Sequence, residues 1–338
     1  MAEHGKGIDK LSIIDIAKMA GVSTATVSRV INKSGPVASK TEKLVNDIIS
    51  RYDYVPNLAA RGMRTNRLPA IGLVIPSVRN EYFSDLATIF QKLFMDLGYF
   101  VFLCTTNNDA QVEKDSIRIL AGQYVSGLII ISKDVVPSVI PESLPTVCID
   151  CQPCRPCDAT IAKVESDNRG GGYMATNALI ESGCREIVLF TGSEEAYTAR
   201  ERAQGYFSAL MQAGLQIDLR RVFHFHSYDY ANGELLVKQL LQSGVAYDGI
   251  FAICDYVLQG SLDALIERGV QIPEKVKVCG FDDLYMAQLA GRKLTTIHQD
   301  SRLVAQTTVQ LLTQMIAGQV PEEKEITIPV KLIRRATA

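Results

Sequence analysis

Four cysteines at three-residue spacing form the run with the most distinctive chemistry: Cys148, Cys151, Cys154 and Cys157. Thiolates at this spacing are typical ligands of zinc or of an iron–sulfur cluster. Cys148, however, lies inside an apolar strand pattern and is expected to be buried, and no second pair follows at zinc-ribbon distance. We therefore expect no metal site and no cofactor, and we keep a thiol- or metal-responsive role of this run as an alternative.

Residues that could form a catalytic centre are scattered. The four histidines have no serine or cysteine partner at motif spacing, and they are His4, His224, His226 and His298. The glycine-rich stretch 168–172 lacks the Lys-Ser/Thr pair of a phosphate-binding loop and instead fits a helix that begins close to a cleft. The sequence predicts a binding protein and not an enzyme.

One helical pattern carries side chains suited to reading DNA. Its outward face holds Thr24, Ala25, Ser28 and Arg29. The short side chains allow a helix to enter the major groove, and an arginine can donate two hydrogen bonds to guanine.

A helix-turn-helix is predicted to position that face. Ser12 and Asp15 form a capping box that starts a first helix, and Gly21 stands where this helix must end. Ser23 then caps the second helix, whose Val27 faces inward. The spacing of small, glycine and branched apolar residues is the one that two closely crossing helices need.

The segment after this motif predicts a third helix and then a weak one. A second capping box, Ser39 with Glu42, is expected to open a helix that ends near Tyr52. The alanine-rich run 57–64 could form two turns, which Gly62 makes unstable in isolation.

Charge is distributed unevenly along the 338 residues. Residues 1–68 hold eleven Lys/Arg against six Asp/Glu, whereas the chain as a whole has a formal net charge of -2. A basic head on an acidic body fits a DNA-binding module joined to a ligand-binding module. No apolar leader or membrane-spanning run is seen, so we expect a cytoplasmic protein with eight reduced cysteines.

From Ile71 onward, short branched-apolar runs alternate with amphipathic helical patterns. This alternation predicts doubly wound parallel sheets with helices on both faces, and its length fits two lobes with a ligand cleft between them. The expected strands are 71–75, 100–104, 127–131, 146–149, 186–191, 249–254 and 277–281, and the expected helices lie near 82–97, 112–124, 169–182, 198–213, 230–243, 255–267 and 301–317.

The chain resembles bacterial repressors of the LacI/GalR family over nearly its whole length. The resemblance is carried, in this order, by IIDIAKMAGVSTATVSRVIN at 13–32, YVPNLAARGMRT at 54–65, VESDNRGGGYMAT at 164–176, ARERAQGYF at 199–207, GFDD at 280–283 and LTTIHQD at 294–300. It implies a helix-turn-helix head on a core like the periplasmic sugar-binding receptors. It also implies a homodimer that binds a double-stranded, pseudo-palindromic DNA operator.

The resemblance assigns residues to DNA contact. It places base-reading contacts at Thr24, Ala25 and Arg29, and phosphate contacts at Ser23, Thr26, Ser28 and Asn32. Asn57 and Ala60 match its hinge helix, and Met63 takes the position of an apolar wedge in the minor groove.

The resemblance also assigns eight contacts for a small-molecule effector, expected to be a sugar or a sugar derivative: Asn80, Tyr82, Phe83, Asp150, Arg202, Tyr228, Asp282 and Gln299. Carboxylates and arginine give directional bonds to hydroxyls, and aromatic faces cover the C–H side of a sugar. Cys151 and Cys254 depart from the sugar-receptor pattern, where Arg and Asn are common. The effector is therefore smaller, less hydroxylated or differently charged, or these positions serve another purpose.

The expected organisation has three parts. Residues 1–56 form the DNA-binding domain, 57–68 the hinge helix and linker, and 69–338 the effector-binding and dimerisation domain. Within the last, lobe 1 is expected to take about 69–165 and 298–321, and lobe 2 about 166–297 and 322–338. The alternative function from another class is a cytoplasmic sugar-binding receptor.

Overall fold

The computed structural model describes residues 11–32, 35–54, 67–132, 139–152, 160–289 and 293–338. It divides the chain into two compact units, Met1–Leu68 and Pro69–Ala338. Among the described residues, no helix combines the length and the apolar character that crossing a bilayer requires.

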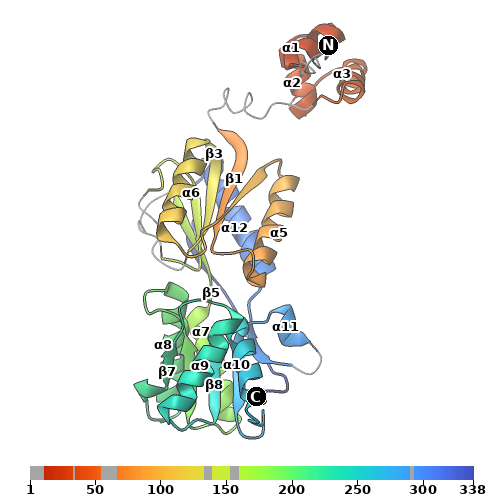
Figure 1. Cartoon of the computed structure of the whole chain (residues 1–338). Helices are drawn as coiled ribbons and strands as arrows, with labels where there is room; N and C mark the ends of the chain where they lie inside the picture. The colour runs from red at the N-terminus through yellow and green to blue at the C-terminus, as the bar shows by residue number, and fades with distance from the viewer. Residues whose placement is uncertain (1–10, 33–34, 55–66, 133–138, 153–159, 290–292) are drawn as a thin grey trace, which may run out of the picture. The chain divides into compact units, whose positions relative to one another are not determined.

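The first unit is a three-helix head (Figure 1) that consists of α1 (Ile13–Ala20), α2 (Thr24–Asn32) and α3 (Ser39–Arg51). Both arms of the predicted capping box between Ser12 and Asp15 are present, and Gly21 ends α1 with a left-handed φ of 64°. Ile16, Val27 and Val45, one from each helix, are fully buried together. The predicted helix-turn-helix is therefore confirmed.

The second predicted capping box, Ser39 with Glu42, is wrong. Ala38 occupies the N-cap position with extended backbone, and no side chain caps the helix. The Ala38 carbonyl already accepts from the Glu42 amide at 3.0 Å, so Ser39 is the first helical residue. Its hydroxyl is consequently one position too late to cap.

The second unit contains two six-stranded sheets with helices on both faces, which confirms the predicted fold class. The sheet of the first lobe has the order β11-β5-β4-β3-β1-β2. Figure 1 shows α5 and α12 on one side of this sheet and α6 on the other. The elements are β1 (Leu68–Ile75), α5 (Glu81–Asp96), β2 (Phe100–Thr105), α6 (Ala110–Gly122), β3 (Val125–Ile131), β4 (Thr146–Ile149), β5 (Ile161–Ser166), α12 (Ser301–Ile316) and β11 (Glu325–Ile328).

The sheet of the second lobe has the order β12-β10-β9-β8-β6-β7, in which β12 runs antiparallel to β10. Its core gathers apolar residues such as Phe190, Phe251 and Phe281, all fully buried. The elements are α7 (Asn168–Glu181), β6 (Ile187–Thr191), α8 (Tyr197–Gln212), a 3-10 turn (Leu219–Arg221), β7 (Val222–His224), α9 (Tyr230–Ser243), β8 (Gly249–Ala252), α10 (Asp255–Glu267), β9 (Lys277–Asp282), α11 (Tyr285–Gln288), β10 (Thr295–His298) and β12 (Lys331–Ile333).

The chain passes between the lobes three times, after β5, after β10 and after β11. The expectation that 322–338 lies wholly in lobe 2 is wrong for one strand. β11 extends the first lobe's sheet, where Ile326 pairs in parallel with Val164 and Ile328 with Ser166. Ile328 is buried in that lobe's core, so the chain crosses only after it.

Candidate functional site

The predicted DNA-reading face lies on α2 in the head. Ala25 and Arg29 are exposed, whereas Thr24 and Ser28 are half-buried. The Ser23 hydroxyl accepts from the Thr26 amide at 3.1 Å and also lies 2.9 Å from the Thr26 hydroxyl. Of the other DNA contacts expected, Asn57, Ala60 and Met63 lie outside the described residues, as does the side chain of Asn32.

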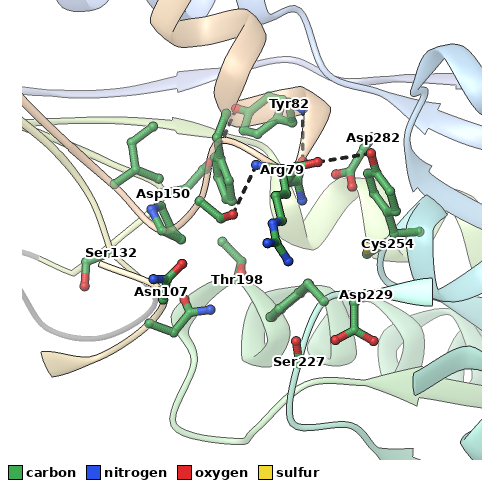
Figure 2. Close-up of a pocket in the computed structure, with 18 of the residues that line it drawn as sticks. Arg79, Tyr82, Asn107, Ser132, Asp150, Thr198, Ser227, Asp229, Cys254 and Asp282 are labelled. Atoms are coloured by element: carbon green, nitrogen blue, oxygen red, sulfur yellow. Dashed lines mark hydrogen bonds between the residues drawn. The ribbon is translucent and has the colours of Figure 1, made fainter. Parts of the chain in front are cut away.

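A cavity of about 690 Å³ lies between the two lobes of the second unit. Figure 2 shows Tyr82 and Asp150 from the first lobe, and Asp282 and Cys254 from the second, around the same space. All eight residues expected to contact an effector line this cavity: Asn80, Tyr82, Phe83, Asp150, Arg202, Tyr228, Asp282 and Gln299. Strand ends and helix starts supply most of them, as expected for a doubly wound sheet.

A buried network centred on Arg202 forms the wall of the second lobe. The Arg202 Nε donates to Asn168 Oδ1 at 2.8 Å, and its terminal nitrogen donates to the Ile253 carbonyl at 2.6 Å. That nitrogen also lies 3.5 Å from Asp282 Oδ1, which accepts from Gln299 Nε2 at 2.7 Å. We call Asn168, Arg202, Asp282 and Gln299 the Arg202 network.

Close helix packing fixes the position of this arginine. A Cβ on Gly172 of α7 would lie 2.2 Å from the Arg202 carbonyl, so α7 and α8 cross at a distance that only glycine allows. The guanidinium carbon then sits 3.6 Å from the centre of the Phe281 ring. The glycine-rich stretch thus positions a cleft residue, a role that goes beyond the sequence prediction of a helix beginning close to the cleft.

Asp150 anchors the deep part of the first lobe. It follows β4 with a left-handed φ of 51° and is buried. Its Oδ1 accepts from the Ser166 amide and from Asn168 Nδ2, each at 3.0 Å, and its Oδ2 accepts from the Tyr82 hydroxyl at 3.3 Å. Because Asn168 also contacts Arg202, the two lobes share one hydrogen-bonded chain at the base of the cavity.

Burial changes the acidity of these carboxyl groups. It raises the pKa of Asp282 to about 7, against the opposing effects of the Arg202 charge and the Gln299 hydrogen bond. It also raises the pKa of Asp150, again opposed by Arg202. Such a carboxyl group accepts hydrogen bonds from a ligand when it is ionised and can donate one when it is protonated.

Aromatic rings line both sides of the cavity. Tyr82 and Phe83 form an edge-to-face pair with centroids 5.6 Å apart, and Tyr228 packs in the same way against Phe225 at 4.9 Å. These fixed rings can cover the apolar face of a ligand.

Sequence reasoning missed several lining residues in loops. Asn107 and Asn108 follow β2, Ser132 follows β3, and Asp229 precedes α9. Ser77, Arg79 and Ser227 are further loop residues of this lining, and Thr198, Tyr230 and Tyr256 lie in the first turns of α8, α9 and α10. The signal that could have found many of them is their place just after a strand, where ligands of parallel sheets bind.

The structure describes two of the four cysteines of the run Cys148–Cys157. Cys148 and Cys151 are fully buried, as expected for Cys148, and Cys154 and Cys157 lie outside the described residues. Within the described part of the chain, no group of three or more His, Cys, Asp or Glu side chains is arranged to hold a metal ion.

Comparisons with known proteins cover both units. The family model described as "Bacterial regulatory proteins, lacI family" matches residues 12–57, and the one described as "Periplasmic binding protein-like domain" matches residues 176–338. The HTH-type transcriptional repressor PurR of Haemophilus influenzae strain PittEE is 31% identical over 334 residues, which are 96% of this chain and 97% of that protein.

Two solved structures resemble the whole chain. The lac repressor dimer bound to operator and the anti-inducer ONPF aligns with a TM-score of 0.85 at 26% identity, over 97% of this chain and 99% of that one. The transcriptional regulator CelR in complex with cellobiose aligns with a TM-score of 0.73 at 27% identity, over 97% and 100% of the two chains. The chain therefore belongs to the lacI family of bacterial regulatory proteins and is a DNA-binding transcriptional regulator.

Proposed function

We propose that this regulator is a repressor that binds a pseudo-palindromic operator as a homodimer and responds to a small molecule held between its lobes. The observation that carries the proposal is the convergence of eight polar and aromatic side chains on one cavity of about 690 Å³. The effector class we propose is a sugar or sugar derivative, in line with the cellobiose complex of the similar regulator CelR. In this proposal the chain acts in the cytoplasm and catalyses no reaction.

Control would operate through the arrangement of the lobes. A ligand that contacts Asp150 in the first lobe and Asp282 in the second favours the lobe arrangement in which both contacts are made. A difference of about 1–3 kcal/mol in affinity between two arrangements is enough for a useful response. The hinge run 57–64 would transmit this difference to the paired heads.

The dimer would cover the edge of the first lobe. β2 is the edge strand of that sheet, and it exposes Phe100 (50%), Phe102 (42%) and Leu103 (45%) to solvent. An exposed apolar edge strand favours association with another chain. A second copy is the occupant we propose, in line with the dimeric lac repressor.

The DNA-binding part can be tested by a gel-shift screen of genomic fragments, with and without a panel of sugars. Once an operator is found, Arg29→Ala should reduce its preference over random DNA by about 1–3 kcal/mol, because a bidentate base contact is lost. Lys43→Ala is the matched control, since Lys43 is an exposed cation of α3. The control should weaken both DNAs alike. An unchanged preference in Arg29→Ala would contradict the assigned reading face.

A further inference from the structure

Arg79 stands on the first lobe's side of the cavity with its main chain fixed and its side chain exposed. Its amide donates to Ser77 Oγ at 3.1 Å, and its carbonyl accepts from the Tyr256 hydroxyl of the second lobe at 3.2 Å. Figure 2 shows the Arg79 side chain extending from this held backbone into the cavity. The main chain of Arg79 is therefore held in place, whereas its guanidinium is exposed.

The other arginine of the cavity is already paired. Arg202 is only 5% exposed, and its guanidinium bonds to Asn168, the Ile253 carbonyl and Asp282. For the Arg79 guanidinium, by contrast, the structure shows no hydrogen bond or ion pair with any of the residues it describes. Among the described residues that line this cavity, Arg79 is therefore the cation with charge available to a ligand.

The surroundings of Arg79 are suited to an oxyanion. Asn107 and Asn108 line the same lobe's side, each with a left-handed φ, at 50° and 61°, in the turn that follows β2. Their side-chain amides and the Ser77 hydroxyl can donate hydrogen bonds to a ligand in the same cavity. We call Ser77, Arg79, Asn107 and Asn108 the lobe-1 rim.

Lobe closure gives this arrangement its selectivity. When the lobes close on a ligand, Arg79 loses water, and an unpaired guanidinium is costly to desolvate. A carboxylate or a phosphate ester can accept two parallel hydrogen bonds from it and offset that cost. A neutral ligand can accept hydrogen bonds from the guanidinium, but it lacks the negative charge that strengthens them. Asp282 in turn offers its carboxyl group to a hydroxyl or an N–H at the opposite wall.

We propose that the effector carries an anionic group, a carboxylate or a phosphate ester, which binds the Arg79 guanidinium at the lobe-1 rim. This proposal rests on the proposed effector function of the cavity and specifies the chemical class of its ligand. An acidic or phosphorylated sugar can place its anionic group at the lobe-1 rim and a hydroxyl group at Asp282.

Matched pairs of probes test the proposal on the full-length protein. Calorimetric titration would compare glucose with glucose 6-phosphate and with gluconate, and ribose with ribose 5-phosphate. At least one anionic member should bind about 10- to 100-fold more tightly than its neutral parent, as expected for hydrogen bonds to a charged group. The carboxylate and phosphate arms identify which anion is used.

Variants assign that preference to Arg79. Arg79→Gln should remove the preference for the anion, and Arg79→Lys should keep part of it. Arg118→Gln is the matched control, because Arg118 is an exposed arginine of the same lobe that pairs with Asp115 on α6. It should leave the preference unchanged.

Asp229 supplies the decisive second variant. It lies on the opposite side of the cavity, and its Oδ1 caps α9 by accepting from the Asn232 amide at 3.0 Å. Asparagine also caps helices well, so Asp229→Asn should fold. If Arg79 binds a ligand anion, this variant strengthens binding of the anionic probe by removing a negative charge from the same cavity.

Three results would overturn the proposal. If a neutral probe binds as tightly as its anionic partner and Arg79→Gln has no effect, the effector function stands and the assignment of an anion fails. If Arg79→Gln and Asp229→Asn weaken a neutral probe equally, the two side chains pair with each other on closure. If no member of any pair binds, the proposed sugar response itself fails and this inference with it.

Discussion

The two sides of the cavity handle charge in opposite ways. The Arg202 network is buried and connected, so each of its charged groups already has a partner inside the protein. The lobe-1 rim is open, and the Arg79 side chain is exposed to solvent. The paired Arg202 network gives the cavity a fixed shape and stabilises the second lobe. The exposed Arg79, by contrast, contributes to ligand selectivity, and it does so only when a ligand binds. The two sides should therefore respond differently to the same kind of substitution.

The largest expected effect is on stability, from Arg202→Met. This change leaves Asp282 and Asn168 buried without their cationic partner, so the free energy of unfolding should fall by about 3–5 kcal/mol. Arg79→Met is the matched control on the lobe-1 rim, and it should change stability by less than about 0.5 kcal/mol. Urea denaturation followed by circular dichroism measures both. Similar losses of unfolding free energy in the two variants would contradict the proposed difference between the Arg202 network and the lobe-1 rim.

The next effect is on pH dependence, through Asp282→Asn. A pKa raised from 3.8 to about 7 means that the folded protein holds a proton the unfolded chain releases. The stabilisation from this carboxyl group is complete below pH 3.8 and is lost as the pH rises through about 7. Replacing it should flatten the fall in unfolding free energy across this window, by at most about 1.4 kcal/mol per pH unit.

Asp229→Asn is the control, because its effect on the pH dependence of the unfolding free energy is expected to have the opposite sign. Burial alone would raise the pKa of Asp229, but hydrogen bonds from Ser227 and Asn232 outweigh burial and lower it. Stability from Asp229 is therefore present at neutral pH and lost as the pH falls through its lowered value. If both variants tilt the stability profile in the same direction, burial does not set the acidity of Asp282.

The parts of this molecule predicted from sequence are those that local chemistry decides. The capping of α1 by Ser12, the stop at Gly21 and apolar strands such as β3 depend on neighbours in the chain, and all are as expected. The eight cavity residues were found through family resemblance, and they do meet in one space. Contacts distant in sequence were the ones that local patterns could not supply.

Two misses show why. β5 was not predicted, because Lys163 and Glu165 interrupt its apolar pattern, although Lys163 is buried in the folded protein. Its burial is tolerated because Glu165 and Tyr197 surround its ammonium group, and Tyr197 comes from the other lobe. Arg79 was overlooked for the opposite reason: an exposed arginine in a loop gives no local signal, and only the cavity around it makes it a candidate.

The smallest expected effect belongs to the contact of Lys163 and Glu165 with Tyr197. This cluster joins the two lobes outside the cavity. The Tyr197 hydroxyl of α8 lies 2.8 Å from Lys163 Nζ and 2.7 Å from Glu165 Oε2, both on β5. Tyr197→Phe keeps the ring that Lys163 Nζ faces at 4.4 Å and removes only the hydroxyl. The variant loses both hydrogen bonds of this hydroxyl, whereas the direct contact between Lys163 Nζ and Glu165 Oε2 at 2.8 Å remains. We expect a net cost of about 1 kcal/mol, which should change the effector concentration for half-release of operator about fivefold.

The direction of that change identifies the lobe arrangement that the cluster stabilises, because the bonds described here exist only while β5 and α8 stay in contact. Tyr173→Phe is the matched control, since its hydroxyl bonds to Gln212 Oε1 at 3.0 Å within the second lobe alone. It should lower stability by a similar amount without moving the effector response. A shift of the response in both variants, or in neither, would mean that Tyr197 contributes to the fold in general and does not bias the lobes. In that case the effector response would depend on the Arg202 network and the lobe-1 rim, and the contact between β5 and α8 would not contribute to it.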